Sequence, residues 1–270
     1  MKIRLGPAGN CILSKGEDTL DSLRNLKKNG LDAQEIEFVR SVYMNNNYAK
    51  RVGELAKNLD IKLSVHAPYY INLASKEKPK IHASKKRILD SCERADLMGA
   101  KYVVFHPAYF GGMEKEKVYH IVLEHMKDMQ STIEKKKWDV FLAPETTGKH
   151  SALGSLDETL RLAKETGTKF CIDSAHLWAR LQGGLDFKEM FEKLKKTKEK
   201  FYHFHFSGIE YTMKGEKNHV NLGENGPDFK EFAKELLKTK IDSTIICESP
   251  VTWRDSLKMK KILEKMGYRF

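Results

Sequence analysis

Eight short apolar runs, each followed by a longer charged and amphipathic stretch, constrain the fold of this 270-residue chain most strongly. The runs are rich in β-branched and aromatic side chains and are bounded by Gly, Pro or Asp, which is typical of buried parallel strands. They cover residues 3–6, 35–39, 63–66, 102–106, 140–145, 170–173, 202–206 and 244–248.

The stretches between these runs have helical spacing. In 19–29 the leucines Leu20, Leu23 and Leu26 recur every three residues, and Gly30 follows as a helix stop. Segments with the same design predict further helices over 47–59, 82–99, 115–137, 157–166, 187–199, 228–238 and 255–266.

This alternation predicts an α/β protein that folds as a (β/α)₈ TIM barrel, because each crossover must return over one face of a parallel sheet. An open doubly wound sheet is the rival, but it usually carries a Gly-rich phosphate loop after its first strand. Residues 6–10 (GPAGN) match neither GxGxxG nor a P-loop. No linker interrupts the pattern, so we expect one TIM-barrel domain over 1–270.

The cysteines and the N-terminus indicate a compartment. No two of the four cysteines form a CxxC pair, which argues against a zinc ribbon or a disulfide framework. No apolar run approaches the roughly 18 residues of a membrane span, and the N-terminus lacks a signal-peptide core. We therefore expect a cytoplasmic protein with no membrane partner.

Potential metal ligands follow six consecutive predicted strands. A lone His at a strand end is most often a core or rim residue, and a lone carboxylate there is most often a cap. In a barrel, however, all these ends meet on one face, where several carboxylates need cations to offset their repulsion. The residues are His66, His106, Glu145, Asp173 with His176 three positions later, His205 and Glu248.

This set exceeds the four ligands of one tetrahedral zinc. If Glu145 bridges, it serves two ions about 3.5–4 Å apart, the usual device for displacement at phosphorus, with a metal-bound hydroxide as the nucleophile. Glu145 and Glu248 are the candidate catalytic residues. His219, in the long loop after the seventh strand, is added to the site, whereas His203 lies deeper and is expected in the core.

At these positions the sequence resembles endonuclease IV, a family of apurinic/apyrimidinic endonucleases within the xylose-isomerase-like barrels. The most specific match is HAPYYINLAS at 66–75. Further matches are VFHP at 104–107, APETTG at 143–148, CIDSAH at 171–176, HFS at 205–207 and ESP at 248–250.

The resemblance implies an enzyme that holds up to three zinc ions and cuts DNA 5′ of abasic sites in base-excision repair. It assigns His66, His106 and Glu145 to a first ion, and Glu145 with Asp173, His205 and Glu248 to a second. His176 and His219 would belong to a third. Zn²⁺ is thus the expected cofactor, with Mn²⁺ as an alternative, and the chain is expected to be a monomer on abasic double-stranded DNA.

The same resemblance points to DNA-binding residues and to a departure. Tyr69, Tyr70 and Asn72 fall in the loop with which the family probes the duplex. The third ion of the family uses an Asp two residues before its last His, and here that position is Lys217. Either Glu216 replaces this Asp through a one-residue shift of the loop, or the third site is empty. In the second case Lys217 itself supplies a fixed positive charge toward the phosphate. Residues 39–43 also lack the family's Lys-Asn and Trp signature.

Charge is compatible with a DNA partner. Lys and Arg number 48 against 37 Asp and Glu, a net charge of +11. Loops of a Lys-rich protein are basic in any case, but a phosphate backbone requires such residues around a metal site. Those in predicted loops on the rim are Lys76, Lys78, Lys80, Lys149, Arg180, Lys214, Lys217 and Arg254.

Two other functions are open at this point. A sugar isomerase or epimerase would use Glu145, Asp173, His205 and Glu248 around one divalent ion, with the two glutamates moving a proton beside a carbonyl. This leaves His66 and His106 without a task. A protein that binds abasic DNA without cutting it, because of the change at Lys217, is the third hypothesis.

Overall fold

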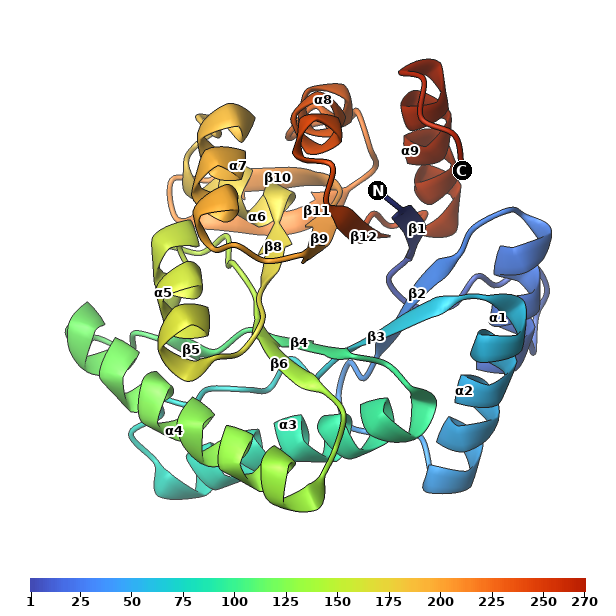
Figure 1. Ribbon diagram of the computed structural model, residues 1–270. Coiled ribbons are helices and arrows are strands. Elements are labelled where there is room, and N and C mark those ends of the chain that lie inside the picture. Colours follow the sequence, from blue (N-terminus) through green and yellow to red (C-terminus); the bar gives the residue numbers. More distant parts are fainter.

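The computed structural model describes residues 1–270 and contains the expected barrel (Figure 1). Its strands form two parallel four-stranded sheets, ordered β1-β12-β9-β8 and β2-β3-β4-β6. Parallel bridges between Ala8 and Glu35 and between Glu145 and Cys171 join the sheets at both seams. The strands are β1 (Ile3–Pro7), β2 (Ala33–Glu37), β3 (Lys62–His66), β4 (Tyr102–Phe105), β6 (Phe141–Pro144), β8 (Cys171–Asp173), β9 (Phe201–Phe206) and β12 (Asp242–Cys247).

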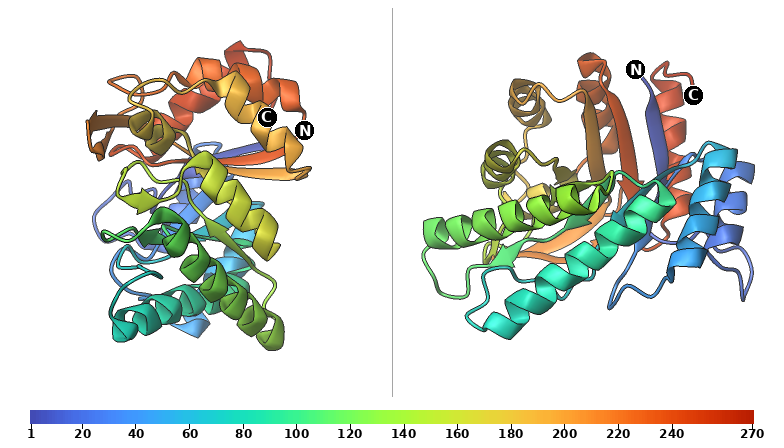
Figure 2. Two further views of the ribbon diagram at one scale, coloured as in Figure 1. Left: turned by 90° about the vertical axis from the view of Figure 1, so that its left-hand side faces the viewer. Right: turned by 60° about the horizontal axis from the view of Figure 1, so that its bottom comes forward.

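Helices cover the outside of the strands (Figure 2). Helix starts follow local chemistry: Asp18 and Ser155 each form a capping box with the residue three positions into their helix. The predicted (β/α)₈ barrel is confirmed. Its outer helices are α1 (Thr19–Lys28), α2 (Asn46–Leu59), α3 (Lys78–Met98), α4 (Lys115–Lys136), α5 (Leu156–Thr166), α7 (Phe187–Lys196), α8 (Phe229–Thr239) and α9 (Trp253–Lys265).

The hydrophobic core lies between the strands and this helical layer. On β9, Phe204 packs edge-on against Phe232 of α8, with ring centroids 5.1 Å apart. Because side chains alternate along a strand, the flanking His203 and His205 lie on the other face, inside the barrel. The core therefore sits outside the strands, and the barrel interior is free to carry polar groups.

Five further elements lie in the loops around the candidate site. The pairs β5 (Ala108–Tyr109) with β7 (Ala152–Leu153), and β10 (Gly208–Thr212) with β11 (Gly215–Val220), are antiparallel, and α6 (Ser174–Arg180) is a short helix. His219 therefore lies in a strand, and the expectation of a long loop there was wrong. The polar hairpin sequence gives no apolar alternation to predict it.

No helix in the structure combines the length and apolar character that crossing a membrane would require.

Candidate metal centre

The residues at the predicted strand ends meet at one end of the barrel. His66 and Asp173 are the last residues of β3 and β8, and His205 lies near the end of β9. His106, Glu145 and Glu248 directly follow β4, β6 and β12. These residues form groups whose ligand atoms lie within 4.8 Å of one another.

Glu145 occupies the middle of these groups and is fully buried. Its Oε2 lies 3.1 Å from His66 Nε2 and 3.0 Å from His106 Nε2. Its Oε1 lies 3.2 Å from His205 Nδ1 and 3.1 Å from His176 Nδ1. Oε2 thus faces His66 and His106 while Oε1 faces His205, which is the arrangement expected of a bridging ligand.

Asp173 and Glu248 complete the second group. Glu248 Oε1 lies 3.2 Å from His205 Nδ1. Asp173 Oδ1 caps helix α6 by accepting the backbone N–H of His176 at 2.6 Å, whereas its buried Oδ2 has no hydrogen-bond partner. A buried carboxylate oxygen left without a partner is costly, and a cation would satisfy it. The donor set therefore fits a divalent metal ion.

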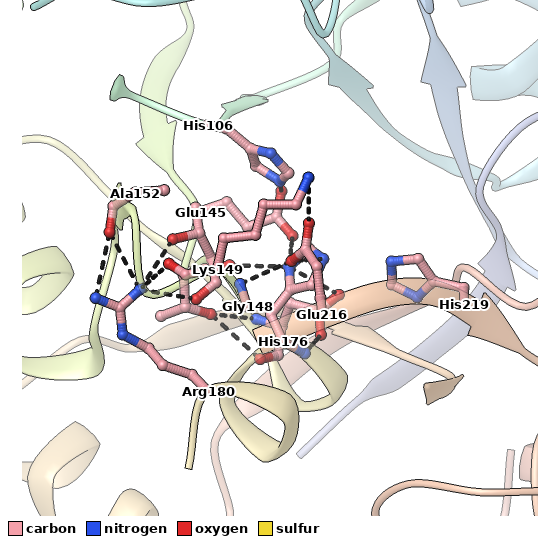
Figure 3. A network of polar contacts seen from close by, with 12 residues as sticks. His106, Glu145, Gly148, Lys149, Ala152, His176, Arg180, Glu216 and His219 are labelled. Atoms are coloured by element: carbon pink, nitrogen blue, oxygen red, sulfur yellow. Dashed lines mark hydrogen bonds and ion pairs between the residues drawn. The ribbon is translucent and has the colours of Figure 1, made fainter. Parts of the chain in front are cut away.

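A further group of possible ligands joins Asp173, His176, His219 and Glu248. Glu216, one of two alternatives in the sequence, lies beside it. Glu216 Oε2 lies 3.2 Å from His176 Nε2, and the rings of His176 and His219 lie 5.0 Å apart (Figure 3). The carboxylate also accepts the backbone N–H of Gly148 at 2.8 Å. Lys149 Nζ lies 3.6 Å from the other oxygen. Glu216 thus lies beside His176 and is available as a further carboxylate ligand.

A β-bulge in the β10–β11 hairpin accounts for this placement. Glu210 pairs with Asn218 but Tyr211 pairs with Glu216, so Lys217 has no partner across the strands. The extra residue shifts the alternation of side chains, and Glu216 takes the inward position that regular pairing would give to Lys217. Lys217 instead lies outside, with its ammonium group 3.0 Å from Glu210. The expectation that Lys217 faces the site is not met, because the bulge turns it away.

Four of the histidines are oriented through their second ring nitrogen. Metal-ligating histidines usually donate this N–H to a carboxylate, a carbonyl or another acceptor, which leaves the first nitrogen free for the ion. The contacts are His66 Nδ1 to the Ala67 carbonyl at 2.8 Å, His176 Nδ1 to the Thr146 carbonyl at 3.0 Å, His219 Nδ1 to Ser207 Oγ at 2.6 Å and His205 Nε2 to Glu35 Oε1 at 2.8 Å.

The electrostatics of the buried carboxylates differ from one residue to another. Burial by itself would raise the pKa of Glu145, but the imidazoles of His106 and His205 outweigh it and hold that pKa well below its usual range. Burial dominates at Asp173 and Glu37 and raises the pKa of each carboxyl. Several carboxylates thus compete for positive charge, which a divalent ion supplies.

Two acidic residues of the site were missed by sequence reasoning. Glu35 and Glu37 both lie on β2, and their carboxylates approach that of Glu248. They stand two positions apart, so they share one face of the strand. This alternation of charged residues within an otherwise apolar run was the available signal.

The chain matches the family described as the xylose isomerase-like TIM barrel over residues 23–266. It belongs to this family. An uncharacterized protein of Methanocaldococcus jannaschii is 35% identical over 97% of both chains. A probable endonuclease 4 of Aquifex aeolicus is 27% identical over 71% of both chains. The resemblance to endonuclease IV is thus confirmed.

Solved structures of the xylose isomerase-like family share the fold. Endonuclease IV from Thermus thermophilus superposes with a TM-score of 0.73 at 18% identity, covering 97% of this chain and 98% of the other. A 3-keto-D-glucoside 4-epimerase from E. coli gives the same TM-score of 0.73 at 15% identity, with coverage of 97% and 99%. The fold is common to both activities, so the choice between them depends on the site.

In this family member several candidate ligands, His66, His106, His176, His219 and Glu248, line a cavity of about 510 Å³ together with Glu37 and Tyr69. A neighbouring groove of about 770 Å³ runs beside it. Its walls combine aromatic and basic side chains: Tyr69, Tyr70 and Tyr109 with Arg40, Lys80 and Arg87. Tyr70 is 65% exposed and Tyr69 is 51% exposed.

Two other predicted contacts have internal roles in the structure. The side-chain oxygen of Asn72 accepts backbone N–H groups of Ala74 at 3.1 Å and Tyr109 at 3.4 Å, so it holds the tyrosine loop in place. Arg180 was placed among the basic rim residues, but its guanidinium donates to carbonyls of Thr147, Lys149 and Ala152 (Figure 3). These bonds fold the segment after β6 over α6 and occupy the charge internally.

Proposed function

We propose that this protein is a metal-dependent phosphodiesterase that cuts double-stranded DNA 5′ of abasic sites, as a base-excision repair enzyme. The observation that carries the proposal is the bridging position of Glu145, with His66 and His106 on one oxygen and His205 on the other. A single-ion enzyme has no use for both sets of imidazoles.

The residues of the chain would divide the work as follows. Bound divalent ions supply Lewis-acid activation of water and neutralise charge on the phosphate. Glu145 and Glu248 would hold these ions through their carboxylate oxygens. His176, His219 and Glu216 would hold a third ion. Glu216 would then take the role that an Asp has in the endonuclease IV family. Zn²⁺ suits this mixture of imidazole and carboxylate ligands, and Mn²⁺ is the alternative.

The tyrosine groove supports a nucleic-acid substrate. Phosphate groups are bound by Lys and Arg, and Arg40, Lys80 and Arg87 line the groove. An enzyme that acts on one nucleotide of a duplex must take it out of the stack, and exposed rings such as those of Tyr69 and Tyr70 can occupy the gap. The probable endonuclease 4 relatives support the same assignment.

The test is incision of a duplex that carries one abasic analogue, with Zn²⁺ or Mn²⁺ supplied and an intact duplex of the same sequence as control. We expect one cut on the 5′ side of the lesion. Tyr70→Ala should weaken binding to the lesion without changing metal content, whereas Phe270→Ala, an exposed aromatic at the C-terminus, should change neither. A metal-loaded protein that leaves the abasic duplex uncut would refute the proposal.

A sugar isomerase or epimerase is the second candidate. Glu145, Asp173, His205 and Glu248 form a complete group for one ion by themselves, and epimerases share this fold. Metal counting separates the two functions, since one ion per chain favours the epimerase and two or three favour the nuclease. Native mass spectrometry counts the bound ions and also gives the mass of the assembly, which tests the expected monomer.

A further inference from the structure

A buried carboxylate lies directly behind the metal centre, in the barrel interior. Glu35 is the middle residue of β2 and its side chain is inaccessible to solvent. Its Oε1 lies 2.8 Å from His205 Nε2, and its Oε2 lies 3.0 Å from His203 Nε2. Strands β2 and β9 belong to different sheets, so this carboxylate joins two histidines across the barrel.

The second histidine is itself held in place. The ring of His203 stacks on Tyr102 of β4, with centroids 5.2 Å apart and 24° between the planes. The hydrogen bond between His203 Nε2 and Glu35 Oε2 and the stacked ring together fix the orientation of the Glu35 carboxylate.

This orientation matters at His205, whose two ring nitrogens have different tasks. Nδ1 lies 3.2 Å from both Glu145 and Glu248, in the second group of ligands. A neutral imidazole binds an ion through the nitrogen that carries no proton, so the proton of His205 must lie on Nε2. Glu35 Oε1 lies 2.8 Å from Nε2, and neither atom has a hydrogen-bond partner elsewhere, so this carboxylate is the acceptor available to that proton.

His205 differs from the other oriented histidines of the site in its acceptor. His66 and His176 donate to backbone carbonyls, and His219 contacts a serine hydroxyl. Among these second ring nitrogens, His205 Nε2 faces only a carboxylate, whereas His176 Nδ1 lies near both a carbonyl and Glu145 Oε1. Hydrogen bonds to ionised groups are about twice as strong as neutral ones, so a carboxylate is a strong acceptor for a proton on Nε2.

We propose that Glu35 is a positioning residue of the metal centre. It accepts the Nε2–H of His205 and so keeps Nδ1 unprotonated and directed at Glu145 and Glu248, while His203 holds Glu35 in register. The inference rests on the metal centre proposed above. It assigns a task to two buried polar residues, Glu35 and His203, that make no contact with the outside.

The first test reads the tautomer directly and needs no bound metal. Two-bond ¹H–¹⁵N correlation spectra of the full chain distinguish Nε2–H from Nδ1–H imidazoles. We expect His205 as the Nε2–H tautomer in the wild-type protein. In Glu35→Gln the amide oxygen still accepts from His205, but its NH₂ group must donate to His203, which should change to the Nδ1–H tautomer. An Nδ1–H signal from wild-type His205 would overturn the proposal.

The second test measures Zn²⁺ affinity by competition with a chromophoric chelator, and the visible spectrum of bound Co²⁺. Loss of such an outer partner costs roughly 10–100-fold in metal affinity, so we expect that loss and an altered Co²⁺ spectrum in Glu35→Leu. Glu35→Gln should stay within a few-fold of wild type. Gln34→Leu is the matched control, because Gln34 is also buried but bonds to Ser22 and Asn10 outside the barrel.

The outcomes separate the inference from the proposed function. Unchanged Zn²⁺ affinity in Glu35→Leu, or an equal loss in Gln34→Leu, would refute the role of Glu35. If zinc affinity depends on Glu35 but the zinc-loaded protein leaves abasic DNA uncut, only the nuclease function is refuted. If Glu35→Leu does not fold, the tautomer measurement on wild type and Glu35→Gln still decides.

Discussion

Glu145 is the residue on which the first two groups of the metal centre depend, since its two oxygens face different imidazoles. Glu145→Gln removes the charge and replaces one oxygen by an NH₂ group that cannot bind a cation. We expect incision of abasic DNA to fall by orders of magnitude, because the bridge between two ions is lost. Elemental analysis should show fewer zinc ions per chain, and the circular dichroism spectrum should be unchanged. Near-normal cleavage by this variant would contradict the bridging assignment.

At this scale the sequence predicts the ligands that follow strands, because strand ends in a barrel converge wherever the exact boundaries fall. The sequence does not predict a role for Glu35, which is a charged residue within a run predicted to be a buried strand. Its role depends on His205 reaching it across the barrel, a contact separated by 170 positions in the chain. No local pattern records such a contact.

In the β10–β11 hairpin, a shift of one residue in the strand register decides whether Glu216 or Lys217 faces His176. Deleting Lys217 removes the bulge and leaves Glu216 two positions before His219, still facing inward. Deleting Glu216 instead brings Lys217 to that inward position, beside His176. We expect the first deletion to retain the zinc content of wild type and the second to lose one ion per chain. Equal zinc contents in the two proteins would contradict the role of the bulge.

Helix α6 and the segment after β6 form a second such unit, joined by Arg180. Its guanidinium makes hydrogen bonds to three carbonyls from a mostly buried position. Arg180→Met should lower the free energy of unfolding by about 2–4 kcal/mol, because those buried acceptors lose a charged donor. Denaturant titration measures this. Arg24→Met is the control, since Arg24 makes an exposed ion pair with Asp21, worth roughly 1 kcal/mol or less. Equal losses of unfolding free energy in the two variants would contradict the role of Arg180 in joining helix α6 to the segment after β6.

Elements were predictable where periodicity is strong. All eight barrel strands and the eight outer helices follow from apolar spacing, since each must bury one face. The two-residue strands β5 and β7 and the polar hairpin carry no such spacing. Their pairing is set by the loops that the barrel brings together, so the structure was needed to find them.

For the whole molecule, we expect the proposed metal centre to contribute to stability as well as to chemistry. Ions that bind only the folded state raise its stability, by about 4 kcal/mol at a concentration 1,000 times Kd. Stripping the protein with a chelator should therefore lower Tm by roughly 10 °C, given the usual change of ~2–4 °C per kcal/mol for a chain of this size. Calorimetry with and without added Zn²⁺ tests this. A Tm insensitive to both chelator and zinc would mean that no tight site exists.

The basic residues that give the net charge of +11 lie in different surroundings in the folded molecule. Arg40, Lys80 and Arg87 line the groove beside the site, whereas Arg180 donates to internal carbonyls and Lys217 pairs with the partly exposed Glu210. Composition alone could not separate these two sets of basic residues. The position of each residue depends on how the barrel folds the loop that carries it.

The bulge at Lys217 has a consequence for how relatives are compared. An alignment places residues in columns, and the column of the family's Asp holds a lysine here, so a column-based search scores the third site as lost. In space the carboxylate is retained, one position earlier and one methylene longer. Chains that have gained or shed a single residue in this hairpin should therefore be sorted by which side chain faces His176, and not by fixed spacing from the last histidine.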